Sequence, residues 1–124
     1  MLRHYLYEAQ QAVSEGGTTD VVVTLLPECE IYRAHFPGMP ITPGVCLVQI
    51  AKELIEDIEK CRLHISQAKD IKFISIVTPG DTPQLHYSLT PQDSVAEAGE
   101  TKWSVCVTAS DVLYCKMSLV LKSL

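Results

Sequence analysis

Residues 43–61 form the one long segment of this chain with the hydrophobic periodicity of a helix. Four apolar residues recur there at three- and four-residue steps: Leu47, Ala51, Leu54 and Ile58. Charged residues fill most of the other positions in its second half. Because proline is tolerated in a first helical turn, we expect the helix to begin at residue 43 or 44 and to end at residue 60 or 61.

Strand patterns account for most of the remaining chain. Residues 5–26 predict two strands joined by a turn at Gly16-Gly17. Four further strands are predicted over residues 69–79, 84–91, 102–110 and 112–122. Because one helix cannot cover both faces of a sheet, we expect an α+β protein, a single domain over residues 1–124, in which an antiparallel sheet of about six strands wraps around one long central helix.

Composition excludes several classes of protein. The chain has 124 residues and a net charge of −5, and no Lys/Arg cluster offsets this charge, which argues against a nucleic-acid partner. The five cysteines are scattered, and the Cys61–His64 spacing has no second ligand pair, so no metal site and no cofactor are predicted. The first ten residues have charge and polarity where a signal peptide needs an apolar run, and no stretch approaches the ~20 apolar residues of a membrane span. We expect a cytoplasmic protein with no membrane partner.

The stretch HFPGMPITPGVCLVQ, residues 35–49, leads into the helix. Its three prolines and two glycines restrict the backbone strongly, and from Cys29 to Pro43 we expect a loop without regular structure. Three pieces of this stretch closely resemble the signature of the 3-hydroxyacyl-acyl carrier protein dehydratases: His35-Phe36-Pro37-Gly38, Pro40-Ile41 and Pro43-Gly44-Val45. The later Pro79-Gly80-Asp81 resembles a strand-turn of the same family.

This resemblance implies the hot-dog fold and a dehydratase or hydratase activity in fatty-acid or related polyketide-type synthesis. The substrate would be a 3-hydroxyacyl thioester on the phosphopantetheine arm of an acyl carrier protein. His35 matches the family's catalytic base, which suits the removal of a C2 proton near neutral pH. Gly44 matches the glycine whose N–H, at the positive end of the helix, polarises the thioester carbonyl. The resemblance also implies that six residues contact the substrate: Phe36, Pro37, Gly38, Pro43, Val45 and Val48.

The chain departs from the family at two helix positions. Fourteen residues after the histidine the family has Glu or Asp, contributed across a dimer, and this chain has Gln49. We expect Gln49 to line the pocket, although an amide cannot donate and recover a proton. Glu53 stands where the family often has Gln. Its charged neighbours favour a solvated helix face; the alternative is a catalytic role through a water or through Gln49.

Further expectations concern assembly and alternative functions. The first two helical turns, Val45 to Ala51, are apolar almost all round, which predicts burial in a homodimer, or in a hetero-oligomer with a paralogue. Three basic residues are candidates for docking the acidic carrier: Arg33, Lys69 and Lys72. Cys46 is interpreted as a packing thiol. Two other functions stay open: a hot-dog thioesterase in which Glu53 activates water, and a non-catalytic acyl-binding subunit.

Overall fold

The computed structural model describes residues 1–35, 38, 40–92 and 99–124, with His35 described by its backbone only. The described elements are, in order, β1 (Tyr7–Ala9), β2 (Val13–Glu15), β3 (Thr18–Leu25), α1 (Glu30–His35), α2 (Gly44–Glu59), β4 (Leu63–Phe73), β5 (Gln84–Gln92), β6 (Glu100–Ala109) and β7 (Val112–Ser123). Neither of these two helices is long and apolar enough to span a bilayer.

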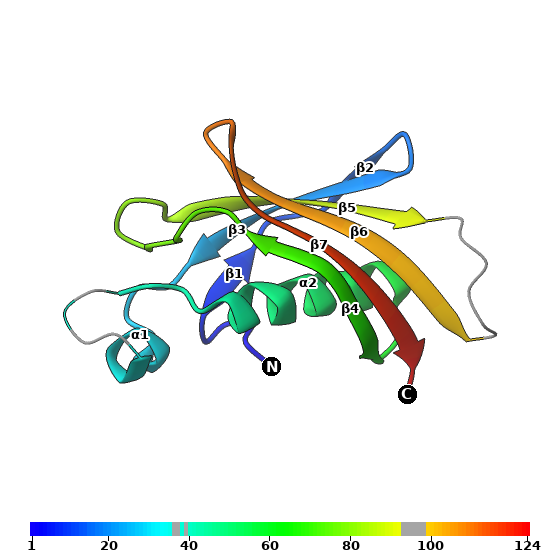
Figure 1. Ribbon diagram of the computed structural model, residues 1–124, viewed down its shortest axis with the longest axis horizontal. Coiled ribbons are helices and arrows are strands. Elements are labelled where there is room, and N and C mark those ends of the chain that lie inside the picture. The colour runs from blue at the N-terminus through cyan, green and yellow to red at the C-terminus, as the bar shows by residue number, and fades with distance from the viewer. Residues whose placement is uncertain (36–37, 39, 93–98) are drawn as a thin grey trace.

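The strands form one antiparallel sheet that curves over α2 (Figure 1). The strand order is β1-β3-β5-β6-β7-β4, and β2 pairs with β3 beside β1. Strand β4 therefore lies at one edge of the described sheet. The long helix lies along the concave face, which confirms the predicted hot-dog fold.

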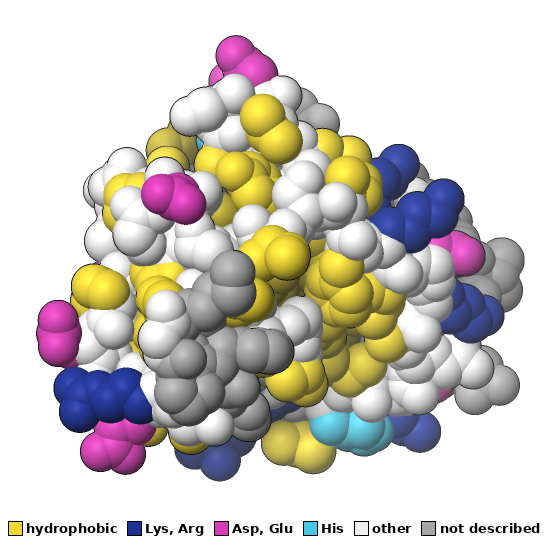
Figure 2. Space-filling view, turned by 60° about the vertical axis from the view of Figure 1, so that its left-hand side comes forward, with side chains coloured by type: hydrophobic (Ala, Val, Ile, Leu, Met, Phe, Trp, Pro, Cys, Tyr) yellow, Lys and Arg dark blue, Asp and Glu magenta, His cyan; other side chains and the backbone are white. Residues whose placement is uncertain are grey.

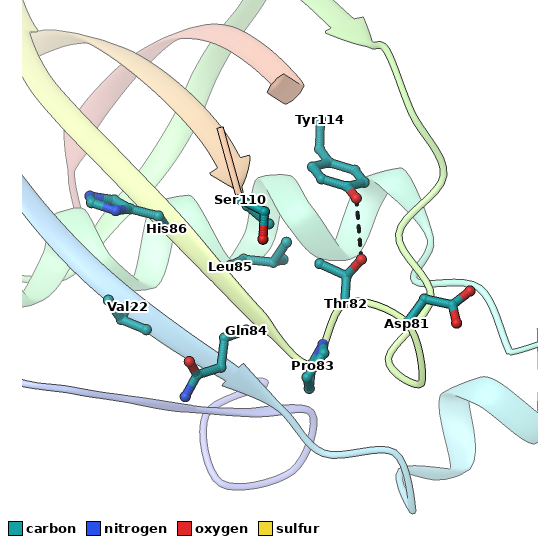
Figure 3. A pocket seen from close by; sticks show the side chains of 10 residues that line it. Val22, Asp81, Thr82, Pro83, Gln84, Leu85, His86, Ser110 and Tyr114 are labelled. Atoms are coloured by element: carbon teal, nitrogen blue, oxygen red, sulfur yellow. Dashed lines mark hydrogen bonds between the residues drawn. The ribbon is translucent and has the colours of Figure 1, made fainter. Parts of the chain in front are cut away.

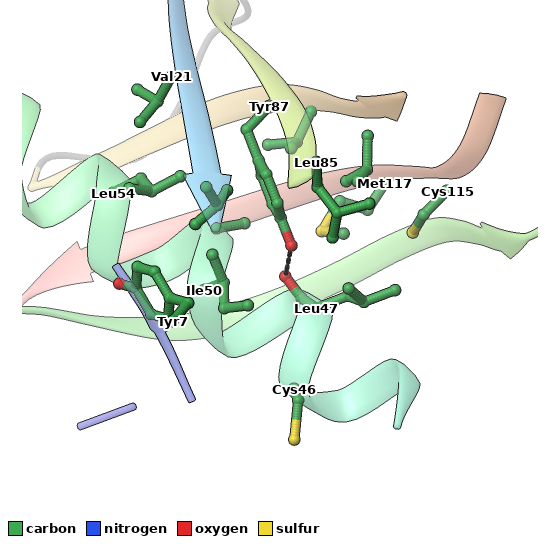
Figure 4. Packing of buried hydrophobic residues seen from close by; sticks show 14 of the residues in the cluster. Tyr7, Val21, Cys46, Leu47, Ile50, Leu54, Leu85, Tyr87, Cys115 and Met117 are labelled. Carbon is green, nitrogen blue, oxygen red and sulfur yellow. Dashed lines mark hydrogen bonds between the residues drawn. The ribbon is translucent and has the colours of Figure 1, made fainter. Parts of the chain in front are cut away.

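The core lies between the sheet and α2. Residues of β3 and β5 alternate between buried and more exposed positions, so each strand turns one row of side chains towards the helix. The helix buries Cys46, Leu47, Ile50, Ala51, Glu53, Leu54 and Ile55. A buried polar contact crosses this layer at the start of the helix: the Tyr87 hydroxyl donates to the Leu47 carbonyl over 2.9 Å (Figure 4). This bond ties the first turns of α2 to the centre of the sheet.

Two tight turns join neighbouring strands, and the first of them confirms the predicted turn at Gly16-Gly17. Gly16 and Gly17 join β2 to β3 with φ angles of 60° and 85°, which glycine adopts without strain. Ser110 and Asp111 join β6 to β7 with φ angles of 49° and 65°, the geometry that suits the twist of two-residue hairpins. The predicted first strand is divided in two, because β1 and β2 pair with different parts of β3.

Two predicted segments were wrong. The predicted loop from Cys29 begins with helix α1, because residues 30–35 contain no glycine or proline and the prolines that break regular structure all follow them. The strand predicted over residues 69–79 ends at Phe73 and begins earlier, at Leu63. As an edge strand it is exposed along most of its length, so its side chains lack the alternation on which the prediction relied.

Candidate active site

The loop that carries the histidine motif is fixed at both ends. Tyr32 of α1 is buried, and its hydroxyl is hydrogen-bonded to the Thr42 hydroxyl over 2.9 Å. The Thr42 backbone N–H donates to the Val77 carbonyl over 2.7 Å. These bonds hold the end of α1, where His35 lies, to the chain that enters α2. Sequence reasoning missed Tyr32 and Thr42, since neither belongs to the pieces that carry the resemblance.

The predicted substrate-contacting residues before the helix are only partly described. Phe36, Pro37 and the side chain of His35 lie outside the described residues. Gly38 is exposed, with φ of 82°, a backbone conformation that favours glycine. The role predicted for His35 therefore stays a prediction.

The start of α2 leaves backbone donors available. Pro43 is the N-cap residue, and within the described chain no side chain caps the helix. The first bonds to the Pro43 carbonyl come from the Cys46 and Leu47 N–H groups, at 2.9 and 3.3 Å. The N–H groups of Gly44 and Val45 precede them and have no partner inside the helix. Two donors at the positive end of a helix can stabilise a developing oxyanion.

An apolar groove of about 650 Å³ runs beside this helix start. Its walls come from the segment before α2, from the first turn of α2 and from the end of β4 with the residues after it: Ile41, Thr42, Pro43, Gly44, Val45, Leu47, Phe73, Ile74, Ser75, Ile76 and Val77. Val45 is 74% exposed and Ile76 67% exposed, whereas Val48 is half-buried. Within a single chain, Val45 is thus exposed, although the first two turns of α2 were predicted to be buried. Hydrophobic side chains form a band across this end of the molecule (Figure 2).

The candidate basic residues for carrier docking lie on two elements. Arg33 of α1 is 73% exposed in its side chain and lies 3.8 Å from Glu28, a distance that leaves it weakly paired. Lys69 and Lys72 are exposed on the edge strand β4. All three can therefore meet an acidic partner, although the chain as a whole is acidic.

Gln49 and Glu53, one helical turn apart on α2, are hydrogen-bonded directly. The Gln49 Nε2 donates to Glu53 Oε2 over 2.8 Å, and the Leu2 backbone N–H donates to the same oxygen over 2.8 Å. Glu53 Oε1 accepts from the Tyr7 hydroxyl at 2.9 Å and from the Arg3 N–H at 3.1 Å. Each carboxylate oxygen therefore accepts two hydrogen bonds.

Glu53 is 1% exposed, and the expectation that it lies on a solvated face was wrong. Burial acts to raise the pKa of this carboxyl, but the hydrogen bonds from Leu2, Gln49, Tyr7 and Arg3 outweigh it and leave the pKa below its usual value. The group is a carboxylate at neutral pH. Sequence reasoning failed here because three of the four donors belong to residues 2, 3 and 7, far from the helix in sequence.

The N-terminal segment is held to α2 by further contacts around Glu53. Arg3 forms an ion pair with Asp57, one turn beyond Glu53, and its guanidinium lies 5.8 Å from the centre of the Tyr7 ring. Burial, followed by the negative charge of Glu53, raises the pKa of Tyr7, so its hydroxyl stays a donor. Both oxygens of the buried Glu53 carboxylate are thus satisfied by donors from the N-terminal segment and from Gln49.

A second pocket, of about 420 Å³, lies between the start of β5 and the turn that joins β6 to β7 (Figure 3). Thr82 and Tyr114 are joined there by a hydroxyl–hydroxyl hydrogen bond of 3.2 Å. Its described lining contains none of the residues predicted for the site.

Nearby, Asp20 accepts from Ser88 at 2.8 Å and contacts His86 Nε2 at 3.0 Å. The carboxylate stands between serine and histidine, so the histidine cannot take the serine proton as in a hydrolase triad. Among the residues described, no three His, Cys, Asp or Glu side chains gather as metal ligands. Cys46 is buried, and burial raises the pKa of its thiol, as suits a packing residue.

The sequence matches one family model and several curated enzymes. The model described as ApeI-like, ApeI dehydratase, matches residues 10–111. The 3-hydroxyacyl-[acyl-carrier-protein] dehydratase FabZ of Lactiplantibacillus plantarum is 39% identical over 70 residues, which are 51% of this chain and 48% of that protein. FabZ of Pediococcus pentosaceus is 34% identical over 92 residues, 68% of this chain and 59% of that protein. The chain spans about half the length of the curated relatives it matches.

Solved structures share the fold at low sequence identity. A chain of the dehydratase heterocomplex ApeI:P from Xenorhabdus doucetiae superposes with a TM-score of 0.70 and 14% identity, over 94% of this chain and 97% of that one. A mutant of thioesterase PA1618 from Pseudomonas aeruginosa gives a TM-score of 0.65 and 9% identity, over 95% and 82%. Dehydratases and thioesterases share this architecture, so the fold alone does not select between them.

Proposed function

Because the chain belongs to the ApeI-like dehydratase family, we propose that it acts as a dehydratase or hydratase on 3-hydroxyacyl thioesters carried by an acyl carrier protein. The observation that carries the proposal is the Tyr32–Thr42 hydrogen bond. It tethers the helix that ends at His35 to the chain that enters α2, whose first N–H groups have no partner inside the helix. A base and an oxyanion site are the two parts that α-proton removal from a thioester requires.

The proposed reaction uses three groups of the chain. His35 takes the C2 proton of the substrate, and the Gly44 N–H stabilises the negative charge that develops on the thioester oxygen. Gln49 holds the C3 hydroxyl. The C3–O bond then breaks, and the leaving hydroxide needs a proton to become water. Of these three groups only the histidine titrates, so it also returns that proton.

The apolar groove supports the assignment of an acyl substrate. A hydrocarbon chain gains free energy from burial in proportion to its apolar area, and the groove opens directly beside Gly44. Its exposed residues Val45 and Ile76 also favour a homodimer, with a site that is completed across the two-fold interface.

The test compares two reactions of the same protein. Hydration of an enoyl thioester is followed by the loss of its conjugated ultraviolet absorbance, and hydrolysis of a saturated acyl thioester by the release of thiol. We expect hydration without hydrolysis, and we expect His35→Ala to abolish it. His86→Ala is the matched control, because His86 lies on the outer face of β5, paired with Asp20. Hydration that survives His35→Ala would exclude the mechanism.

A second candidate is an acyl-binding subunit that pairs with an active paralogue. Gln49 favours it, because an amide at the position of the family's acid cannot titrate. A thioesterase is not favoured: the carboxylate oxygens of Glu53 already accept four hydrogen bonds, which leaves no position for a nucleophilic water. An inactive wild type that gains activity on Gln49→Glu would identify the binding subunit.

A further inference from the structure

The side-chain amide of Gln49 has two chemically different ends, and its contact with Glu53 decides which end is turned outward. An amide nitrogen only donates hydrogen bonds, and an amide oxygen only accepts them. Glu53 is a carboxylate that only accepts, so the nitrogen must face it, as the 2.8 Å Nε2–Oε2 contact shows. The carbonyl oxygen of Gln49 is therefore directed away from Glu53. In the described part of the chain, that oxygen receives no hydrogen bond.

The carboxylate of Glu53 is itself held in place. Oε2 takes a second hydrogen bond from the Leu2 N–H, and Oε1 takes two from Tyr7 and Arg3. A carboxylate with donors on both oxygens cannot rotate without losing several charge-assisted bonds in a buried site. Hydrogen bonds from the N-terminal segment thus hold the Glu53 carboxylate in one position, and this carboxylate sets the orientation of the Gln49 amide.

We infer that Glu53 is a positioning residue, which holds Gln49 with its carbonyl oxygen towards the ligand, so that the site selects thioesters with a hydrogen-bond donor at C3. A 3-hydroxyacyl chain has such a donor. A 3-oxoacyl chain has an acceptor in the same place, which would face the Gln49 oxygen without a proton between them. The inference deepens the proposed function and rests on it for the placement of the acyl chain beside Gln49.

A purely structural role for Glu53 makes a different prediction. If the cluster only ties the N-terminal segment to α2, its loss should weaken the binding of both ligands equally. If it also orients the amide, its loss should change the ratio of the two affinities. The ratio is therefore the decisive quantity.

The experiment measures, by titration calorimetry, the binding of 3-hydroxybutyryl and 3-oxobutyryl groups attached to pantetheine through an amide. The amide replaces the thioester because its C2 protons are less acidic, which prevents turnover. We expect the wild type to prefer the hydroxy ligand about three- to tenfold, the value of one hydrogen bond. In Glu53→Gln the residue-49 amide is free to turn, and the ratio should fall to about one.

Tyr7→Phe is the matched control. It removes one hydrogen bond from the same carboxylate, at Oε1, but leaves the Oε2 contact with Gln49. It should keep the wild-type ratio, even if the protein is less stable. If Glu53→Gln does not fold, Gln49→Met serves instead: it removes the carbonyl, leaves three donors on Glu53, and should also bring the ratio to about one. An unchanged ratio in Glu53→Gln or Gln49→Met would overturn the inference.

A second readout needs no ligand. The side-chain amide protons of Gln49 can be assigned in a ¹⁵N–¹H spectrum by their absence in Gln49→Met. We expect slow solvent exchange of these protons in the wild type and Tyr7→Phe, and fast exchange in Glu53→Gln. If the wild type binds neither ligand, the proposed function fails, and equal exchange rates in all three proteins would separately refute the fixed orientation.

Discussion

The phenyl ring of Phe73 lies against Gly44, and a Cβ atom at position 44 would come within 2.6 Å of the ring's Cζ atom. No side chain fits there unless the ring or the helix start moves. Phe73 ends the edge strand β4 and is 54% exposed, so its ring is the part that can move. The absence of a side chain at Gly44 thus lets the end of β4 approach the start of α2, and both residues line the apolar groove.

We therefore expect Gly44→Ala to destabilise the protein by about 1 kcal/mol, at the lower end for overpacking, because the displaced ring is half exposed. Phe73→Ala combined with Gly44→Ala should cost less than the sum of the single changes, with a coupling of about 0.5 kcal/mol or more. Urea unfolding measures the free energy of unfolding of the two single variants and of the double variant. Gly80→Ala is the control, since apart from Gly80 and its two chain neighbours the described structure has no heavy atom within 4 Å of its Cβ position. Additive costs would show that the ring does not restrict position 44.

Acid should weaken the cluster at Glu53. The pKa of this carboxyl is below its usual value near 4.5, so the stability it contributes is present above that value and is lost as the pH falls through the folded-state pKa. We expect Glu53→Gln to lower the free energy of unfolding at pH 7 by about 1–3 kcal/mol, and the difference from wild type to shrink below pH 4.5.

Urea unfolding at pH 7 and at acid pH checks this expectation. Glu28→Gln is the control, because it removes the same charge from a side chain that is 92% exposed and pairs only loosely with Arg33. It should leave the stability nearly unchanged at both pH values. A difference between Glu53→Gln and wild type that stays constant with pH would contradict the assignment of Glu53 as a buried carboxylate.

Local patterns predicted most of the fold, and non-local contacts account for what they missed. The bounds of α2 and of the Gly16-Gly17 turn follow from the residues in those segments alone. The burial of Glu53 depends on backbone N–H groups of Leu2 and Arg3, which have no sequence signal that points to the helix. Strand β4 was misplaced because an exposed edge strand lacks hydrophobic alternation. Helix α1 was missed because the prolines that follow it were taken to prevent regular structure over the whole segment from Cys29 to Pro43.

The exposed apolar side chains on the walls of the groove should be covered in solution by a second copy of the chain. Val45 and Ile76 are 74% and 67% exposed on its walls, which is costly in water for side chains of this size. We expect light scattering at micromolar concentration to give the mass of a dimer, and Ile76→Asp to give a monomer. Val112→Asp, at the exposed start of β7, should remain dimeric. A monomeric wild type would exclude a site shared between two copies.

Charge reversal at Arg33 should separate carrier docking from chemistry. Arg33 lies in α1, two residues before His35, with 73% of its side chain exposed. We expect Arg33→Glu to lower the rate with a carrier-linked substrate and to flatten its salt dependence, because long-range attraction to an acidic partner is screened by salt. The rate with a free pantetheine thioester should not change. The same reversal at Arg62, just beyond the far end of α2, should leave both rates unaltered; equal losses at the two positions would indicate an effect of net charge.

Gln49→Glu should raise the dehydratase activity above that of the wild type. The new carboxyl would stand where Gln49 now contacts Glu53 at 2.8 Å. Two carboxyl groups at this distance cannot both ionise easily, so they share a proton and the pKa of one is raised. A protonated carboxyl near neutral pH can give its proton to the leaving C3 hydroxyl. We expect enoyl hydration and its reverse to rise about 10²-fold, within the range for gaining a general acid.

The pH profile distinguishes this account from a simple gain of polarity. In Gln49→Glu the rate should fall as the pH rises through the raised pKa of the carboxyl pair. In the double variant Gln49→Glu with Glu53→Gln, the neighbour is an amide, which has no charge and can donate a hydrogen bond to the new carboxylate, so the fall should occur at lower pH. Glu53 would then have a measurable effect on catalysis without touching the substrate. Identical profiles for the single and double variants would show that positions 49 and 53 do not interact during the reaction. The 2.8 Å contact between the two side chains would then have no effect on catalysis.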